Sequence, residues 1–227
     1  MPRNAIRSLL LVAPHPDDET FGCGGTVAVL SEAGAEVRVI FVTDGSGSHP
    51  GHPTLTPSGL AVLRKAEARR SLAILGVPVE RLNFLDAPDG KMKDLSKEQI
   101  DELVHAIAAC LRHSGATTLL LPCRNDGSSE HEAVFRLTQM AVMESGIAIR
   151  ILEYPVWSWW SPRLRLRCVA SYGKVWRSPL GSKRSTKVAA MAAYNSQLRP
   201  IPPQPDPVLP RGFGASFDNS DEFFFER

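Results

Sequence analysis

The sequence predicts one α/β domain built around a mostly parallel β-sheet. Two observations support this fold class. Several short apolar runs lack the alternation of a half-exposed strand, as expected for strands that are buried on both faces. These runs alternate with longer segments of helical character, several of which end at a glycine. Strands that alternate with helices form parallel sheets covered on both faces, and 227 residues suit one such domain.

The elements of the first two thirds of the chain follow from these patterns. Five strands are expected, over residues 8–13, 36–42, 81–85, 117–121 and 147–154. Helices are expected over residues 24–33, 58–75 and 96–113, and over a segment that carries His131, Val134, Leu137 and Met140. Sheets of this kind bind ligands at the carboxyl ends of their strands. His15, Asp44 and His131 all follow such ends.

The pattern changes after Tyr154. A short strand near residues 167–170 and a helix over residues 185–197 are expected. Trp157, Trp159 and Trp160 favour either stacking on a sugar ring or packing of an interface. Residues 200–210 are rich in proline and are predicted to be extended. We therefore divide the chain into a domain of residues 1–199 and a tail of residues 200–227, whose three terminal phenylalanines pack on this domain or on a neighbouring subunit.

The most informative segment is Ala13–Glu19, which reads Ala-Pro-His-Pro-Asp-Asp-Glu and directly follows the first strand. One imidazole and two adjacent carboxylates can bind a divalent metal and leave a carboxylate free as a base. Acidic groups in a row beside a buried strand repel one another unless a cation or a pKa shift relieves the cost. The alternative is a solvated loop in which an aspartate caps the next helix. The sequence favours the metal site.

This segment is similar to the signature of the LmbE-like, or PIG-L, family of metal-dependent N-deacetylases. Further similarity lies in Thr43-Asp44-Gly45, Arg64-Lys65-Ala66-Glu67 and Pro88-Asp89-Gly90, and in the segment around His131. The helix with Lys187, Ala190, Ser196 and Gln197 also fits, with Tyr194 where the family often has histidine. The resemblance extends to about Gln197. It implies a Rossmann-like three-layer sandwich and removal of acetyl from an N-acetylglucosamine-type sugar or glycoconjugate.

The resemblance also implies the catalytic residues. His15, Asp18 and His131 are expected to bind one Zn²⁺ per chain, and Asp17 is expected to be the general base. Zinc with two imidazoles and one carboxylate keeps a position for water and lowers the pKa of that water, the expected nucleophile. Asp17 would take the proton and return it to the departing amine.

Three further residues are expected behind the metal ligands. Glu19 is expected to orient a ligand or cap the helix, and Asp44 lies in the loop after the second strand. Ser128 stands where relatives have a histidine that stabilises the oxyanion, within the segment Asp126-Gly127-Ser128-Ser129-Glu130-His131. Zinc, a backbone N–H or another side chain would then have to take over that role.

Substrate contacts are expected from Arg64, Asp89 and Arg124. Arg64 is a sugar or phosphate contact by resemblance, but its spacing from Glu67 also fits a surface ion pair on one helix face. Asp89 is a sugar-hydroxyl acceptor by resemblance, and a structural turn residue otherwise. Arg124 is a candidate oxyanion donor.

Composition excludes several classes of partner. A net charge of +2 implies no nucleic-acid surface. Basic residues gather late in the chain and form either a solvated face or a site for an anionic substrate. They are Arg163, Arg165, Arg167, Lys174, Arg177, Lys183, Arg184 and Lys187. The four cysteines lack C-x-x-C spacing, which disfavours a zinc knuckle or a thiol redox site. No apolar run reaches membrane-span length and no signal peptide is evident, so we expect a cytoplasmic protein. The sequence is compatible with a monomer or a homo-oligomer.

The sequence therefore predicts a zinc-dependent N-deacetylase acting on a small N-acetylated sugar or glycoconjugate. A sugar-binding homologue that keeps zinc with little turnover is the first alternative, because of Ser128. The second is a glycosyltransferase-like enzyme that holds a metal-nucleotide with Asp17 and Asp18. The presence of both Asp17 and His131 favours the deacetylase.

Overall fold

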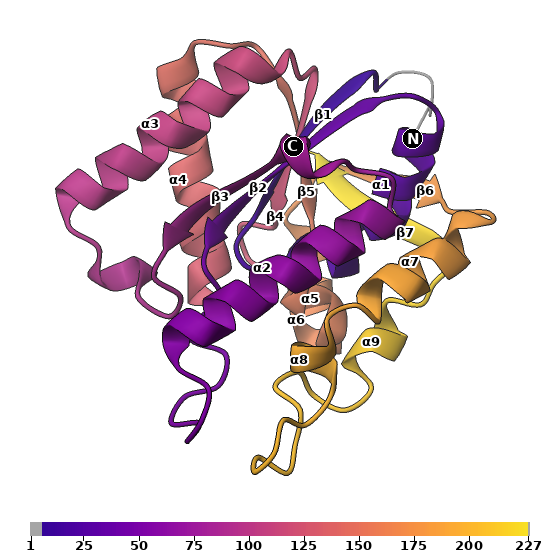
Figure 1. The fold of residues 1–227 in the computed structure, drawn as a ribbon. Coiled ribbons are helices and arrows are strands. Elements are labelled where there is room, and N and C mark those ends of the chain that lie inside the picture. Colours follow the sequence, from indigo (N-terminus) through magenta and orange to yellow (C-terminus); the bar gives the residue numbers. More distant parts are fainter. Residues whose placement is uncertain (1–5, 227) are drawn as a thin grey trace.

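The computed structural model describes residues 6–226 as a three-layer α/β sandwich (Figure 1). A seven-stranded sheet forms the middle layer, with strand order β3-β2-β1-β4-β5-β7-β6. Strands β1 to β5 are parallel to one another, and β7 pairs antiparallel with both β5 and β6. The predicted mostly parallel sheet with helices on both faces is confirmed.

The strands are β1 (Ser8–Ala13), β2 (Glu36–Thr43), β3 (Leu82–Ala87), β4 (Thr118–Pro122), β5 (Arg150–Tyr154), β6 (Lys174–Pro179) and β7 (Asp221–Glu226). The long helices are α1 (Asp18–Glu32), α2 (Pro57–Ile74), α3 (Lys97–Ser114) and α4 (Ser129–Ser145). Shorter helices are α5 (Trp157–Trp160), α6 (Pro162–Ala170), α7 (Lys183–Met191), α8 (Asn195–Leu198) and α9 (Phe213–Ser216), with 3₁₀ turns η2 (Val79–Arg81) and η3 (Met92–Asp94).

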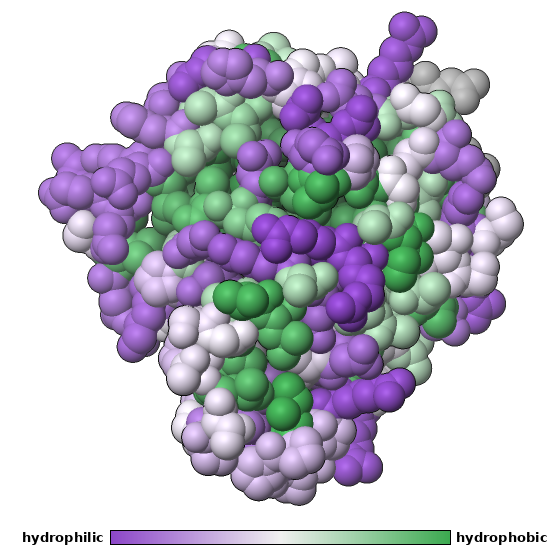
Figure 2. All heavy atoms as spheres, viewed as in Figure 1, coloured by the Kyte–Doolittle hydropathy of each residue, from purple (hydrophilic) through white to green (hydrophobic). Residues whose placement is uncertain are grey.

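The central strand β1 shows why its sequence is apolar without alternation. Leu9 and Leu11 belong to the core on the side of α1, α2 and α7, whereas Leu10 and Val12 belong to the core beneath α3 and α4. All four side chains are buried. In Figure 2, hydrophilic residues predominate on the outward surfaces of α2 and α3, and hydrophobic patches interrupt them; Val62 on α2 is 70% exposed. No helix within residues 6–226 has the length and hydropathy that a membrane crossing needs.

Helix α1 begins earlier than predicted, at Asp18 rather than Gly24. Acidic residues in its first turn suit the positive end of the helix dipole, so the acidic run continues into the helix. Two glycines in the first half of the helix allow close packing. A Cβ atom on Gly22 would lie 2.4 Å from the ring of Tyr154, and one on Gly25 would lie 2.4 Å from Leu180. The helix therefore needs glycine to lie close to the sheet and to the segment before α7.

The last third of the chain differs most from the prediction. The strand expected over residues 167–170 is wrong, because these residues continue α6, which Ser161 caps and Pro162 opens. The helix expected over residues 185–197 is divided into α7 and α8. The tail after Pro200 adds β7 to the sheet, with Phe224 and Phe225 buried. Strands β6 and β7 were not predicted.

Candidate active site

Four loops at the carboxyl ends of parallel strands build the candidate site. His15 follows β1, Asp44 follows β2, Asp89 follows β3, and the loop after β4 leads to His131. The first two loops are joined because the backbone N–H and hydroxyl of Thr43 both donate to the Pro14 carbonyl, each at 2.9 Å. A cavity of about 550 Å³ opens between these loops, at the sheet edge where the topology predicts a ligand site.

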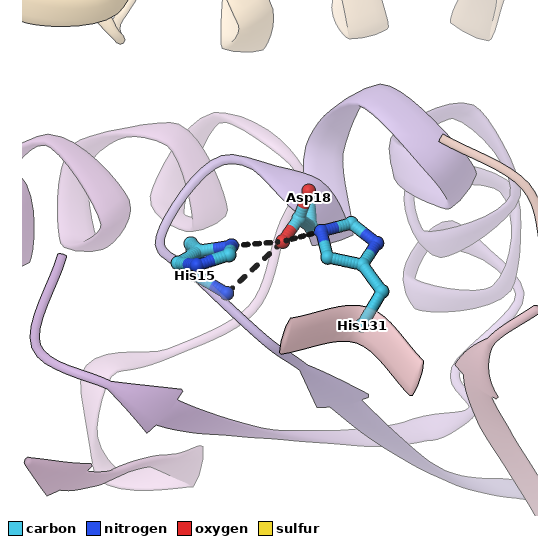
Figure 3. A group of neighbouring side chains, drawn as sticks. All are labelled: His15, Asp18 and His131. Carbon is cyan, nitrogen blue, oxygen red and sulfur yellow. Dashed lines mark hydrogen bonds and ion pairs between the residues drawn. The ribbon is translucent and has the colours of Figure 1, made fainter. Parts of the chain in front are cut away.

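The predicted metal ligands come together (Figure 3). One carboxylate oxygen of Asp18, Oδ2, lies 3.0 Å from Nδ1 of His15 and 3.2 Å from Nε2 of His131. Nε2 of His131 is buried and has no partner in hydrogen-bond geometry. A buried imidazole nitrogen without a partner beside a carboxylate and a second imidazole fits a divalent cation.

Asp126, which was not predicted as a site residue, holds His131 in place. Its Oδ2 lies 2.7 Å from Nδ1 of His131, so this nitrogen carries the proton and Nε2 faces Asp18. The carboxylate also accepts the backbone N–H groups of Val156, Trp157 and Ser158 and the Ser158 hydroxyl. Burial lowers the pKa of His131, but Asp18 and Asp126 outweigh it and raise this pKa to about 9. A metal ion would have to displace the second ring proton, the one on Nε2, so metal affinity depends on pH.

The expected base, Asp17, lies in the same cavity. Its backbone φ of 138° is unfavourable for a residue with a side chain. Arg64 supports this conformation, since its Nη2 donates to the Pro16 carbonyl at 2.6 Å and lies 3.0 Å from the Asp17 carboxylate. Burial raises the pKa of Asp17 to about 7, with Arg64 opposing the rise and Asp18 adding to it. A buried carboxylate with a pKa near neutrality suits general-base catalysis.

Glu19 and Tyr194 hold the backbone of Asp17. The N–H of Asp17 donates to Oε2 of Glu19 at 2.9 Å, and the Tyr194 hydroxyl donates to Oε1 at 2.5 Å. Both side chains are completely buried. Burial raises the pKa of Glu19 to about 7 even though three donors oppose it. Tyr194 therefore positions Glu19, the residue that holds the backbone N–H of Asp17.

Two carboxylates surround the second nitrogen of His15. Its Nε2 lies 2.7 Å from Oε2 of Glu130 and 3.2 Å from Oδ1 of Asp89. These contacts, together with Asp18, outweigh burial and raise the pKa of His15 well above its usual value. Asp44 accepts the N–H of Asp89 at 3.3 Å and fixes that turn. Glu130 was missed by the sequence analysis, although Glu130 and Asp126 are the two acidic positions of the segment that ends at His131.

The remaining predicted residues have other contacts. Ser128 lines the cavity and caps α4, with its hydroxyl accepting the N–H of His131. The structure does not bring Arg124 to the cavity, because its guanidinium pairs with Glu153 and lies over the ring of Tyr172. The alternative of a surface ion pair between Arg64 and Glu67 is wrong, since Arg64 is buried against Asp17.

The comparisons with known proteins agree with this fold. Residues 10–142 match the model of the PIG-L family, described as GlcNAc-PI de-N-acetylase. This match spans more than half of the chain, and the chain belongs to the PIG-L family.

A diacetylchitobiose deacetylase from Thermococcus kodakarensis is 36% identical over 103 residues. The aligned segment covers 43% of this chain and only 36% of that relative, so the chain matches about a third of its length. Among solved structures, the A40926 pseudoaglycone deacetylase Dbv21 superimposes with a TM-score of 0.70 at 20% identity, over 97% of this chain and 96% of that one. The 4-carboxy-2-hydroxymuconate hydratase GalB from Pseudomonas putida KT2440 superimposes with a TM-score of 0.71 at 17% identity, covering 93% and 82%. At these identities the two structures show the shared fold alone.

Proposed function

We propose that this protein is a metal-dependent hydrolase that removes the acetyl group from an N-acetylglucosamine-type amino sugar or glycoconjugate. The observation that carries the proposal is the buried Nε2 of His131, which has no hydrogen-bond partner and lies close to ligand atoms of His15 and Asp18. The Asp17 carboxylate lines the same cavity. Membership of the PIG-L family and the deacetylases among its relatives support the same reaction.

Each residue then has a defined part in the reaction. His15, Asp18 and His131 would hold one Zn²⁺, since two imidazoles and a carboxylate form one of the usual ligand sets of catalytic zinc. The bound ion would polarise the amide carbonyl and make water more acidic. Asp17 would accept the proton of the attacking water and deliver it to the departing amine. Arg64 would keep Asp17 in position, and Asp126 would keep the lone pair of His131 directed at the site.

Ser128 supports one alternative, a homologue that binds the sugar and metal with little turnover. Its hydroxyl caps α4, and the family resemblance implies that an oxyanion-stabilising histidine stands at this position in relatives. Loss of one oxyanion donor typically costs about 3–4 kcal/mol of transition-state stabilisation. Turnover separates this alternative from the deacetylase.

The test is acetate release from a panel of N-acetyl sugars and glycoconjugates by the zinc-loaded protein, with Asp17→Asn as the control. We expect Asp17→Asn to keep the metal and lower kcat by about a hundred-fold or more. Absence of acetate from the whole panel would favour the binding protein. Loss of zinc in Asp17→Asn would instead make Asp17 a ligand.

A further inference from the structure

The cavity beside the candidate metal site is strongly acidic. The carboxylates of Asp17, Asp18, Asp89 and Glu130 line it, and among the described residues Arg64 is the one lysine or arginine that does so. Once a divalent cation is bound, Asp18, Asp89 and Glu130 are enough to balance the charge of that cation and of Arg64, and an ionised Asp17 leaves an excess of negative charge. The basic residues that gather between positions 163 and 187 do not line the cavity.

Arg64 has little capacity left for an anionic ligand. Nη2 donates to the Pro16 carbonyl and lies 3.0 Å from Asp17, whereas Nη1 donates to the Gly45 carbonyl and lies 3.8 Å from Asp89. Its unpartnered Nε lies against Gly45, 2.9 Å from where a Cβ atom would stand. A phosphate or carboxylate entering the cavity would lose its hydration and meet mostly like charge.

A second part of the lining is apolar and comes from other segments of the chain. It consists of Phe21 on α1, Val156 and Trp157 where β5 leads into α5, and Val208, Leu209 and Phe213 near the end of the chain. Trp157 is only partly buried and Val208 is 36% exposed, so both offer apolar surface to a ligand. A cavity of about 550 Å³ is within the roughly 300–1,000 Å³ typical of small-molecule sites.

Building on the deacetylase function, we propose that the substrate is an N-acetylated amino sugar joined to an uncharged aglycone with an apolar face. The acidic loops receive the sugar and its acetamido group, and the apolar lining receives the aglycone. Conjugates with a phosphate or carboxylate next to the sugar are excluded by the charge of the same cavity.

The test compares three compounds that share one sugar and one anomeric configuration: the methyl glycoside, the phenyl glycoside and the 1-phosphate of N-acetylglucosamine. Acetate release by the zinc-loaded protein gives kcat/KM for each. We expect the phenyl glycoside to exceed the methyl glycoside by roughly tenfold, mainly through KM, because the ring is buried on apolar surface. We expect the 1-phosphate to lie about a hundred-fold or more below the methyl glycoside. A 1-phosphate equal to the methyl glycoside, or a phenyl glycoside no better than it, would overturn the proposal.

A charge variant tests the exclusion directly. Val208→Lys places a cation at the apolar lining where the side chain can still reach water, and should raise kcat/KM for the 1-phosphate by up to about fivefold. Val175→Lys is the matched control, because Val175 is 50% exposed on β6 and does not line the cavity. An equal effect of the two variants, or no effect of Val208→Lys, would contradict exclusion by charge.

Binding separates this proposal from the deacetylase function. If none of the three compounds releases acetate, the proposed reaction fails, but calorimetric titration of the same compounds into the zinc-loaded protein still decides the aglycone. Binding in the order phenyl, methyl, 1-phosphate would support the uncharged aglycone. Equal binding of the three, or no binding, would overturn it.

Discussion

Replacing Asp126 by asparagine should weaken metal binding at the candidate site without changing a predicted ligand. All the groups that face the Asp126 carboxylate are hydrogen-bond donors: three backbone N–H groups, the Ser158 hydroxyl and Nδ1 of His131. The amide NH₂ of an asparagine would therefore have to face donors whichever way it turned. The least costly arrangement directs it at His131, which would move the ring proton to Nε2. His131 would then present a proton to the site in place of a lone pair.

The expected size of the effect follows from this geometry. Loss of a partner that orients a ligating histidine typically costs about 10–100-fold in metal affinity. Asp126 is fully buried, and breaking a buried charged pair costs about 3–5 kcal/mol of stability. We therefore expect a lower melting temperature of the metal-free protein and a smaller increase of that temperature when zinc is added.

Zinc competition titrations and thermal unfolding with and without zinc measure the two effects. Asp86→Asn is the matched control, because Asp86 is a half-exposed aspartate that pairs with Lys65. Its backbone is left-handed, a conformation that asparagine also tolerates. Zinc affinity of Asp126→Asn equal to that of wild type would refute the role of Asp126 in orienting His131. An equal loss in Asp86→Asn would show that the effect is not specific to this site.

Three further predictions concern the residues around the base and the ligands. Tyr194→Phe should cost about 1–3 kcal/mol of stability and lower kcat with little change in KM, because Glu19 loses a hydrogen-bond donor. The control Tyr154→Phe should lower stability without changing kcat, and equal kcat values in the two variants would contradict a positioning role of Tyr194. Since burial raises the pKa of Glu19 from 4.5 to about 7, the folded protein holds this proton more tightly than the unfolded chain, and the metal-free protein should lose up to about 3 kcal/mol of stability as pH rises from 4.5 to 7. Chemical unfolding between pH 4 and 8 measures this loss, and a Glu19→Gln variant whose stability depends on pH as the wild type does would disprove it. Ser128→His should lower stability by about 1 kcal/mol, because it removes the cap of α4. A several-fold rise in kcat would show that the site lacks an oxyanion donor, whereas an unchanged or lower kcat would show that another donor is present.

The parts of the fold that the sequence predicted are those with strong local signals. Strand β1 is buried on both faces, so its apolar run is continuous, and the capping box at Ser96 marks the start of α3 with the bond pattern that the structure shows. The antiparallel edge was missed because β6 and β7 are about forty residues apart, and their pairing depends on contacts that neither segment reveals alone. Charged residues along both strands also weaken the strand signal, although Phe224 and Phe225 of β7 are buried.

The candidate site was predictable where one short segment carries several functional groups. His15, Asp17 and Asp18 lie within four residues, so their proximity needs no knowledge of the fold. Asp126 and Arg124 lie two residues apart in one loop, yet one points to His131 and the other to Glu153. The direction in which a loop side chain points depends on its tertiary partners, and residue type alone does not reveal it.

The contacts of Asp126 also join the two halves of the cavity. The backbone N–H groups that it accepts belong to Val156, Trp157 and Ser158, and the first two of these residues line the apolar part. A substitution at Trp157 that moves this backbone would thus alter the orientation of His131 as well as contact with the aglycone. Changes in KM at Trp157 would therefore combine metal and aglycone effects. Val208 lies about fifty residues further along the chain and has no bond to Asp126 among the described residues, which makes it the better position for separating aglycone recognition from metal binding.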